Sequence, residues 1–430
     1  MSPVLSPELT DLIIDKLCHD EEALKNCALV CRLFLPRSQK HLFTTIDLEF
    51  PELKPSRRPH PATRLLEVLN PRLAYNIRDL RITDYTENFW DSNKNKCTDN
   101  TDNVLPLLFE QLHELQSFEL SVAYDGETCH CLSDGLISAL VKLFHRTRVA
   151  EVSIQGANGF PISLLAFHCP GIRRLDLRWS DSDAEHGEGE HVNPKEETTI
   201  EPLNLPASRE SGSLEVLEID DISCASIRKL YEAAKLPRSE LTFSHLREID
   251  LCGADIDSLK FISKVACDAD ESLERLVWDY LDMVGGQQCF QSDRMFFALP
   301  RCIRSLSLSF LHDYRDPPLH FQWLYSALEK NAECNNLQEM TLVLTFAAFP
   351  PNLDAGRNWE HSVPMLSQLD SILAGPQYQH LRRVTIYLDY ASTYDDTFEA
   401  RVSMLYMVVV TEMLWAKFPL LVGKGILSVE

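Results

Sequence analysis

Residues 246–251 read Leu-Arg-Glu-Ile-Asp-Leu, an apolar-x-x-apolar-x-apolar pattern that returns along most of the chain. Its last two apolar residues flank one polar residue, which is the alternation of a β-strand with one buried face. A single match would be weak evidence, but ten copies indicate a repeated unit. The middle apolar residues of these copies are Leu80, Phe118, Val152, Leu175, Leu217, Ile249, Leu276, Leu306, Met340 and Val384. The group Phe43, Ile46 and Leu48 is a candidate eleventh copy.

Helix-like segments lie between the copies, and we predict helices over Leu136–Phe144, Ile227–Ala234, Leu259–Val265 and Trp323–Lys330. One strand and one helix per unit predict an α/β fold. Residues 76–430 would form a leucine-rich-repeat-like solenoid, a horseshoe with a parallel sheet. We expect it to be irregular, because the middle apolar residues of neighbouring copies lie from 23 residues apart (152 to 175) to 44 apart (340 to 384). Regular leucine-rich repeats carry an asparagine three residues after the last apolar residue, and none of the ten copies has an asparagine there.

The main alternative is a doubly wound α/β enzyme, which also alternates strands and helices. That fold needs a functional loop after a strand, and the sequence contains neither a G-x-S-x-G nor a G-x-G-x-x-G motif. The segment His186–His191 lies in an acidic insertion, at about 181–201, that we predict to be disordered. The segment Cys129–Cys131 lacks a second pair of zinc ligands. We therefore expect a protein that is not an enzyme and uses no cofactor or metal. An enzyme built from scattered carboxylates and histidines is the less favoured account.

The residue between the last two apolar positions is polar in nine of the ten copies, so this face of the sheet should be solvated. Acidic residues gather at its centre, with two arginines beside them. Our hypothesis is that this face recognises a basic segment of a protein substrate. The alternative is a strand face that is charged only because it meets water. The candidate substrate-binding residues are Arg174, Asp176, Arg178, Glu218, Asp220, Asp250 and Asp279.

The first 48 residues follow a different pattern, that of three short helices. Ser6 can cap the first helix, Pro7 suits its first position, and Leu9 and Ile13 recur at helical spacing. Asp20 can cap a second helix, and a third should run from about residue 36 to residue 42. Helices this short depend on packing for their stability. We predict a helical module over residues 1–48 and, over residues 49–75, a proline-containing linker with the first repeat helix.

The order of residues in this module resembles the F-box, in particular that of the F-box/leucine-rich proteins abundant in fungi. The resemblance rests on Leu-Ser-Pro-Glu-Leu at 5–9, Ile-Ile at 13–14, Leu17, and the block from Leu24 to Phe34 with Val-Cys-Arg at 30–32. His-Leu-Phe at 41–43 closes the match, which covers about the first tenth of the chain closely. Two positions depart from the usual pattern: Ser6 separates Leu5 from Pro7, and Phe34 stands where tryptophan is common.

This resemblance implies a substrate-recognition adaptor of an SCF-type (Skp–cullin–F-box) E3 ubiquitin ligase. The N-terminal helices would dock to the Skp adaptor and, through it, to a cullin, while the solenoid would bind an unknown protein substrate. The alternatives are a helical cap over the first repeat and a binding scaffold with no ligase connection. Carried onto this sequence, the residues that would contact the Skp adaptor are Leu5, Pro7, Leu9, Ile13, Leu24, Val30 and Phe34.

The composition agrees with a protein-binding role in the cytoplasm or nucleus. The formal net charge of −23, from 41 Lys+Arg against 64 Asp+Glu, argues against binding to nucleic acid or to an anionic membrane. The 13 cysteines are odd in number and scattered, so we expect reduced thiols. We find no secretory signal. Val402–Trp415 is too short to span a bilayer, and we predict a buried helix there.

Overall fold

The computed structural model describes residues 6–50, 61–84, 101–122, 134–156, 160–178, 212–220, 223–253, 256–281, 299–312, 319–331, 336–346, 363–390 and 397–430. The fold is α/β, with a parallel sheet of 12 strands, a second sheet of two short strands and, over the described residues, 14 α-helices. Packing divides the chain into two units. Unit 1 comprises Met1–Ser213 and Ala225–Thr242, and unit 2 comprises Leu214–Cys224 and Phe243–Glu430.

The large-sheet strands of unit 1 are parallel and pair in the order in which they occur along the chain. They carry their apolar residues in register, so that Ile82 lies opposite Leu48 and Leu120, and Ile154 lies opposite Leu120 and Leu177. These apolar side chains are buried, which gives the sheet one continuous apolar face. The strands are β1 (Thr45–Phe50), β2 (Asp79–Asp84), β3 (Ser117–Val122), β4 (Glu151–Gln155) and β5 (Arg174–Arg178).

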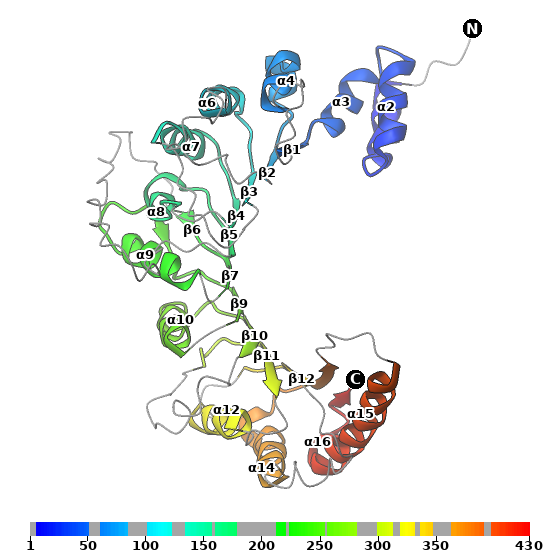
Figure 1. The fold of residues 1–430 in the computed structure, drawn as a ribbon, viewed down its shortest axis with the longest axis vertical. Helices are drawn as coiled ribbons and strands as arrows, with labels where there is room; N and C mark the ends of the chain where they lie inside the picture. The colour runs from blue at the N-terminus through cyan, green and yellow to red at the C-terminus, as the bar shows by residue number, and fades with distance from the viewer. Residues whose placement is uncertain are drawn as a thin grey trace. The chain divides into compact units, whose positions relative to one another are not determined.

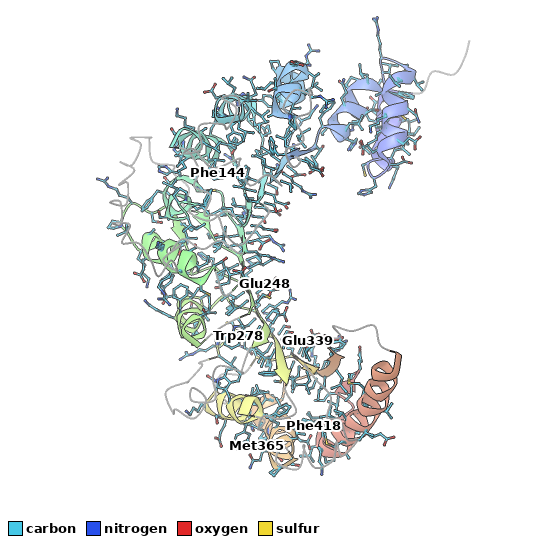
Figure 2. All side chains as sticks on the ribbon, in the orientation of Figure 1. Phe144, Glu248, Trp278, Glu339, Met365 and Phe418 are labelled. Carbon is cyan, nitrogen blue, oxygen red and sulfur yellow. The ribbon has the colours of Figure 1, made fainter. Side chains whose placement is uncertain are left out.

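The helices that follow these strands cover the apolar face. In Figure 1, α4, α6 and α7 lie along one side of the unit 1 strands. Phe118 of β3 meets Phe109 and Phe144 edge-on, with ring centroids 6.3 and 5.3 Å away, which joins β3 to α6 and α7. Figure 2 labels Phe144 among the side chains. The unit also contains the two-stranded sheet of β6 (Gly212–Ser213) and β8 (Leu241–Thr242). Its remaining elements are α1 (Pro7–Lys16), α2 (Glu21–Val30), α3 (Leu35–Leu42), α4 (Pro61–Val68), α5 (Pro71–Ala74), α6 (Thr101–Gln111), α7 (Asp134–Arg146), α8 (Ser163–His168) and nearly all of α9 (Cys224–Ala234).

Unit 2 repeats the arrangement of strands with covering helices. Trp278 of β10 is fully buried and lies 5.8 Å from Trp323 of α12, measured between ring centroids. Both oxygens of the buried Asp370 accept main-chain N–H groups, from Leu420 and Leu421 at 2.9 Å each, and so cap α16. The elements of the unit are β7 (Val216–Asp220), β9 (Glu248–Cys252), β10 (Arg275–Leu281), β11 (Ser305–His312), β12 (Glu339–Phe346), β13 (Arg383–Tyr390), β14 (Leu427–Val429), α10 (Ile256–Asp268), α12 (Leu319–Lys330), α14 (Val363–Leu373), the 3-10 turn η1 (Pro376–Tyr378), α15 (Thr397–Lys417) and α16 (Pro419–Lys424).

A ladder of main-chain hydrogen bonds marks the start of the strands. The carbonyl oxygen of Thr44 accepts from the N–H groups of Arg78 and Asp79, at 2.8 and 3.0 Å, and the carbonyl of Arg78 accepts from Gln116 and Ser117 in the same way. Within unit 2 the same double acceptance occurs at the carbonyls of Glu215, Arg247, Glu274, Arg304 and Gln338. This main-chain ladder lies at the start of the strands, whereas the asparagines of regular repeats would lie beyond their ends.

The strands predicted from the repeated pattern are present. The middle and last apolar residues of all ten copies lie on strands, and Ile46 and Leu48 of the candidate eleventh copy lie on β1. The four predicted helices lie within α7, α9, α10 and α12, and the third N-terminal helix is α3. The sequence pattern missed β6, β8 and β14, which have only two or three residues each.

One predicted environment is wrong. Val402–Trp415 is helical, as part of α15, but Val408, Val409 and Trp415 are exposed, so the helix is not buried on all sides. Leu5, Cys129–Cys131, the acidic insertion at 181–201 and residues 51–60 of the linker lie outside the described residues. Among the helices that the structure describes, none combines the length and the apolar character needed to cross a membrane.

Candidate functional site on the N-terminal helices

Local sequence signals begin the first two helices. The N–H of Leu9 donates to the Ser6 hydroxyl oxygen at 3.4 Å, and Pro7 occupies the first helical position of α1. The N–H of Ala23 donates to Asp20 Oδ1 at 2.9 Å and caps α2. Both caps satisfy N–H groups that have no partner within the helix, as the sequence predicted.

The three helices enclose a very small apolar interior. Both α1 and α2 pack on α3. Among residues 6–42, the only buried apolar side chains are Ile14 of α1 and Leu24 of α2. Two buried side chains are too few to account by themselves for the stability of three helices of eight to ten residues.

Half of the large apolar side chains in residues 6–42 are instead exposed. Six residues, which we call the docking surface, have exposed fractions from 51% to 85%: Leu9, Leu12, Ile13, Leu29, Val30 and Leu33. The first three lie on α1, and the others lie at the end of α2 and in the turn after it. Exposed apolar groups gathered on a small module are typical of a surface that a partner covers.

The structure sorts the predicted contact residues into two groups. Leu9, Ile13 and Val30 belong to the docking surface, Pro7 is exposed at the start of α1, and Phe34 is half-buried before α3. Leu24 is only 2% exposed, so the prediction that it contacts a partner is wrong. It packs inside because it belongs to the inward stripe of α2.

Sequence reasoning missed Leu12, Leu29 and Leu33 as candidate contact residues. The missed signal lies in the helical wheel of α2. Its inward stripe contains Leu24 and Ala28, which leaves the neighbouring Leu29 pointing elsewhere.

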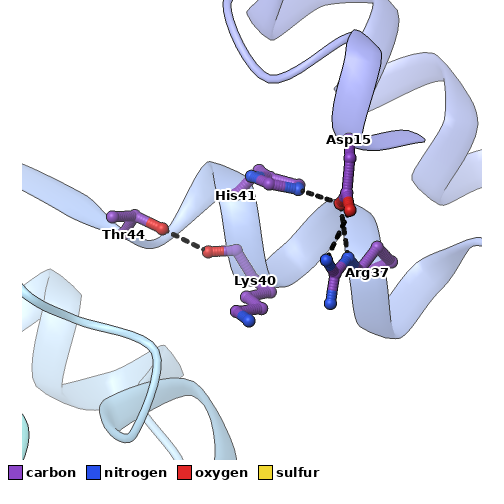
Figure 3. A network of polar contacts seen from close by, with 5 residues as sticks. All are labelled: Asp15, Arg37, Lys40, His41 and Thr44. Carbon is purple, nitrogen blue, oxygen red and sulfur yellow. Dashed lines mark hydrogen bonds and ion pairs between the residues drawn. The ribbon is translucent and has the colours of Figure 1, made fainter. Parts of the chain in front are cut away.

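A polar cluster joins α1 to α3, as Figure 3 shows. Arg37 donates through Nε and Nη2 to the two oxygens of Asp15, both at 2.5 Å. His41 Nε2 lies 2.8 Å from Asp15 Oδ1. The bonds from Arg37 and His41 hold the pKa of Asp15 well below its usual range, and Asp15 in turn raises the pKa of Arg37. We call Asp15, Arg37 and His41 the α1–α3 clamp.

The polar strand face of unit 1, where substrate contacts were predicted, carries paired charges. Arg81 lies between Asp47, at 3.9 Å, and Glu119, at 3.4 Å. Asp176 on β5 accepts from Ser153 at 3.1 Å and from Arg178 at 3.0 Å. Arg174 is exposed at the start of the same strand. Predicted residues of both signs therefore occupy β5.

In unit 2 the corresponding face is mainly acidic on its first three strands, β7, β9 and β10. Glu218 and Asp250 lie opposite each other on β7 and β9, and Asp279 lies on β10. Arg275 forms an ion pair with Glu248, a residue labelled in Figure 2. Burial, together with the charges of Asp279 and Glu218, raises the pKa of Asp250 to about 6. Burial also raises the pKa of Asp279.

Asp220 does not belong to this acidic face. It is buried, and its Oδ1 accepts the N–H of Ser223 at 2.8 Å, in the turn that leads into α9. The prediction that Asp220 contacts substrate is therefore wrong, because its carboxylate satisfies the main chain of this turn.

Neither the comparisons with known proteins nor a metal site among the described residues identifies the chemistry of these surfaces. Among the described residues, no group of three or more His, Cys, Asp or Glu side chains could hold a metal ion. The eight cysteines in the described part of the chain form no disulfide. No protein-family model matches the sequence, and no curated protein matches it.

Proposed function

We propose that this protein is a substrate-recognition adaptor of an SCF-type ubiquitin ligase, working in the cytoplasm or nucleus. Its docking surface would bind the Skp adaptor, and its strand–helix body, as an irregular leucine-rich-repeat-like solenoid, would bind a protein substrate. The observation that carries the proposal is the exposure of six large apolar side chains on α1, on α2 and in the turn after α2. The F-box-like order of residues in these helices agrees with it.

The energetics favour a covered docking surface. Burying one exposed leucine, isoleucine or valine side chain is worth about 1.5–3 kcal/mol, and an anchor at the centre of an interface about 2 kcal/mol or more. Leu9, Ile13 and Val30 each expose half or more of their surface, so each can contribute such an anchor. In the free protein these apolar side chains remain in contact with water, which costs free energy, whereas a bound partner would cover them.

The substrate side of the proposal rests on the strand faces. The positive side chains of a basic partner segment would bind the acidic residues on the face of unit 2, which are Glu218, Glu248, Asp250 and Asp279. The mixed charges of Arg174, Asp176 and Arg178 on β5 would add specificity by repelling badly matched partners. Ubiquitin transfer would take place on other subunits of the ligase, so this chain would contribute binding and positioning without catalysis or a cofactor.

Direct binding to the purified Skp adaptor tests the proposal. We expect the wild-type chain to form a complex on size-exclusion chromatography. Changing Leu9 and Ile13 together to aspartate should weaken binding by at least 100-fold in calorimetry. The matched control is Leu107→Asp, because Leu107 on α6 is exposed to a similar extent, 53%, and lies outside the three helices.

Two results would contradict the proposal: no complex with the wild-type chain, or equal affinity for the double variant. Circular dichroism must show the same helix content in all variants, so that a loss of binding reports the surface and not the fold. A chain that captures a protein partner through its body, but never binds the Skp adaptor, would be a scaffold with no ligase connection.

A further inference from the structure

The position of α1 cannot depend on apolar packing alone. Its buried side chains are Ile14 and Thr10, whereas Leu9, Leu12 and Ile13 point to solvent. Thus α1 carries three of the six residues of the docking surface, yet it buries only one large apolar side chain. A second interaction must hold it in place.

The α1–α3 clamp provides that interaction. Asp15 belongs to α1, and its two partners lie on α3 four residues apart, which places them on the same side of that helix. The arginine bonds are bidentate, a geometry that fixes orientation as well as distance. His41 adds a third contact to Oδ1, so the carboxylate of Asp15 is held from two successive turns of α3.

Asp15 itself does not belong to the docking surface. With about 100° of rotation per residue, Asp15 lies about 160° around α1 from Ile13, about 120° from Leu9 and about 60° from Leu12. A partner that covers Leu9 and Ile13 therefore lies on the other side of α1 from the carboxylate. An effect of Asp15 on the contacts of Leu9 and Ile13 must act through the position of α1.

We propose that Asp15 is the positioning residue of the docking surface. By pairing with Arg37 and His41 it fixes α1 on α3, and so presents Leu9, Leu12 and Ile13 together with the residues at the end of α2. This inference rests on the proposed docking function. It adds that one polar cluster, on the other side of α1 from Leu9 and Ile13, decides what fraction of molecules is ready to dock.

The expected size of the effect follows from that fraction. The apparent dissociation constant equals the intrinsic constant divided by the fraction of molecules in the competent state. If loss of the clamp leaves α1 docked on α3 in about one molecule in ten, the apparent constant rises about tenfold. The intrinsic contacts with the partner stay the same.

The test uses the full chain and the variant Asp15→Asn, which keeps the size of the side chain and removes its charge. Hydrogen exchange of the free protein should quicken about tenfold in α1 and stay unchanged in β2–β5. Affinity for the Skp adaptor should fall about tenfold. The control is Glu67→Gln on α4, which removes an exposed carboxylate outside the three helices.

A double-variant cycle separates positioning from general damage. If the clamp acts as a unit, Asp15→Asn combined with Arg37→Met should weaken docking no more than Asp15→Asn alone. Additive losses, unchanged exchange in α1, or equal acceleration in α1 and in the sheet would overturn the inference. Should the wild-type chain not bind the Skp adaptor, the proposed function fails, and the exchange of α1 still decides whether Asp15 fixes that helix.

Discussion

The three N-terminal helices and the strand–helix body differ in how far they bury their apolar side chains. In the body, Phe118, Leu175, Ile249 and Trp278 are essentially inaccessible to solvent, whereas α1 to α3 bury only Ile14 and Leu24 and expose six residues. Each interior strand of the body has a neighbour on both sides and a helical layer over its apolar face. Among the described residues, α1 and α2 pack mainly on α3. The difference teaches that apolar pattern alone does not determine burial, because burial also requires neighbours.

The largest effect should come from the core of the body. Phe118→Ala removes a ring that contacts both Phe109 and Phe144, and should lower the free energy of unfolding by about 3–5 kcal/mol. Ile13→Ala, on the exposed side of the comparison, should change it by less than about 0.5 kcal/mol. Urea unfolding followed by circular dichroism measures both. Equal losses would break the comparison.

An intermediate effect is expected within a single helix. Leu24→Ala empties one of the two buried apolar positions of the module and should cost about 2 kcal/mol. Leu29→Ala, five residues later, changes a side chain that is 85% exposed and should have almost no effect on stability. Hydrogen exchange in α2 reports both variants. If Leu29→Ala opened α2 as much as Leu24→Ala, the docking surface would be part of the interior.

The last effect depends on pH and concerns the polar face of the body. Because its pKa is raised to about 6, Asp250 binds its proton more tightly in the folded state than in the unfolded state. Its contribution to stability is therefore complete below about pH 4, the range of an unperturbed carboxyl, and is lost as the pH rises through 6. Unfolding measured from pH 4 to 7 should show this decrease, and Asp250→Asn should flatten it. An identical pH profile for the variant would contradict the assignment.

The strands could be predicted from the sequence because each copy is local. An apolar pattern of six residues is readable wherever it occurs, and ten copies support one another. The strand β14 was missed because three residues are too few to form a pattern. Asp220 looked like a surface residue because the pattern around it does not reveal that the following turn needs its carboxylate.

The docking surface could be predicted only in part. The residues Leu9 and Ile13 recur at helical spacing, but spacing does not say whether the apolar side of a helix is covered. The clamp could not be foreseen at all, because Asp15 lies 22 residues from Arg37 and 26 from His41. Such pairs become visible only when the packing of α1 on α3 is known.

The main-chain ladder has a consequence for how such a chain can diverge. Its acceptors are the carbonyls of residues as unlike as Thr44, Arg78, Gln116 and Ala150, and every amino acid has that group. Changing the side chains of these residues leaves their carbonyl acceptors in place. Proline at a donor position such as Arg173 or Arg247 would instead remove an N–H group from the ladder. Main-chain hydrogen bonds, and not particular side chains, thus align the strands. Two chains can then keep the same sheet while few of their side chains remain alike.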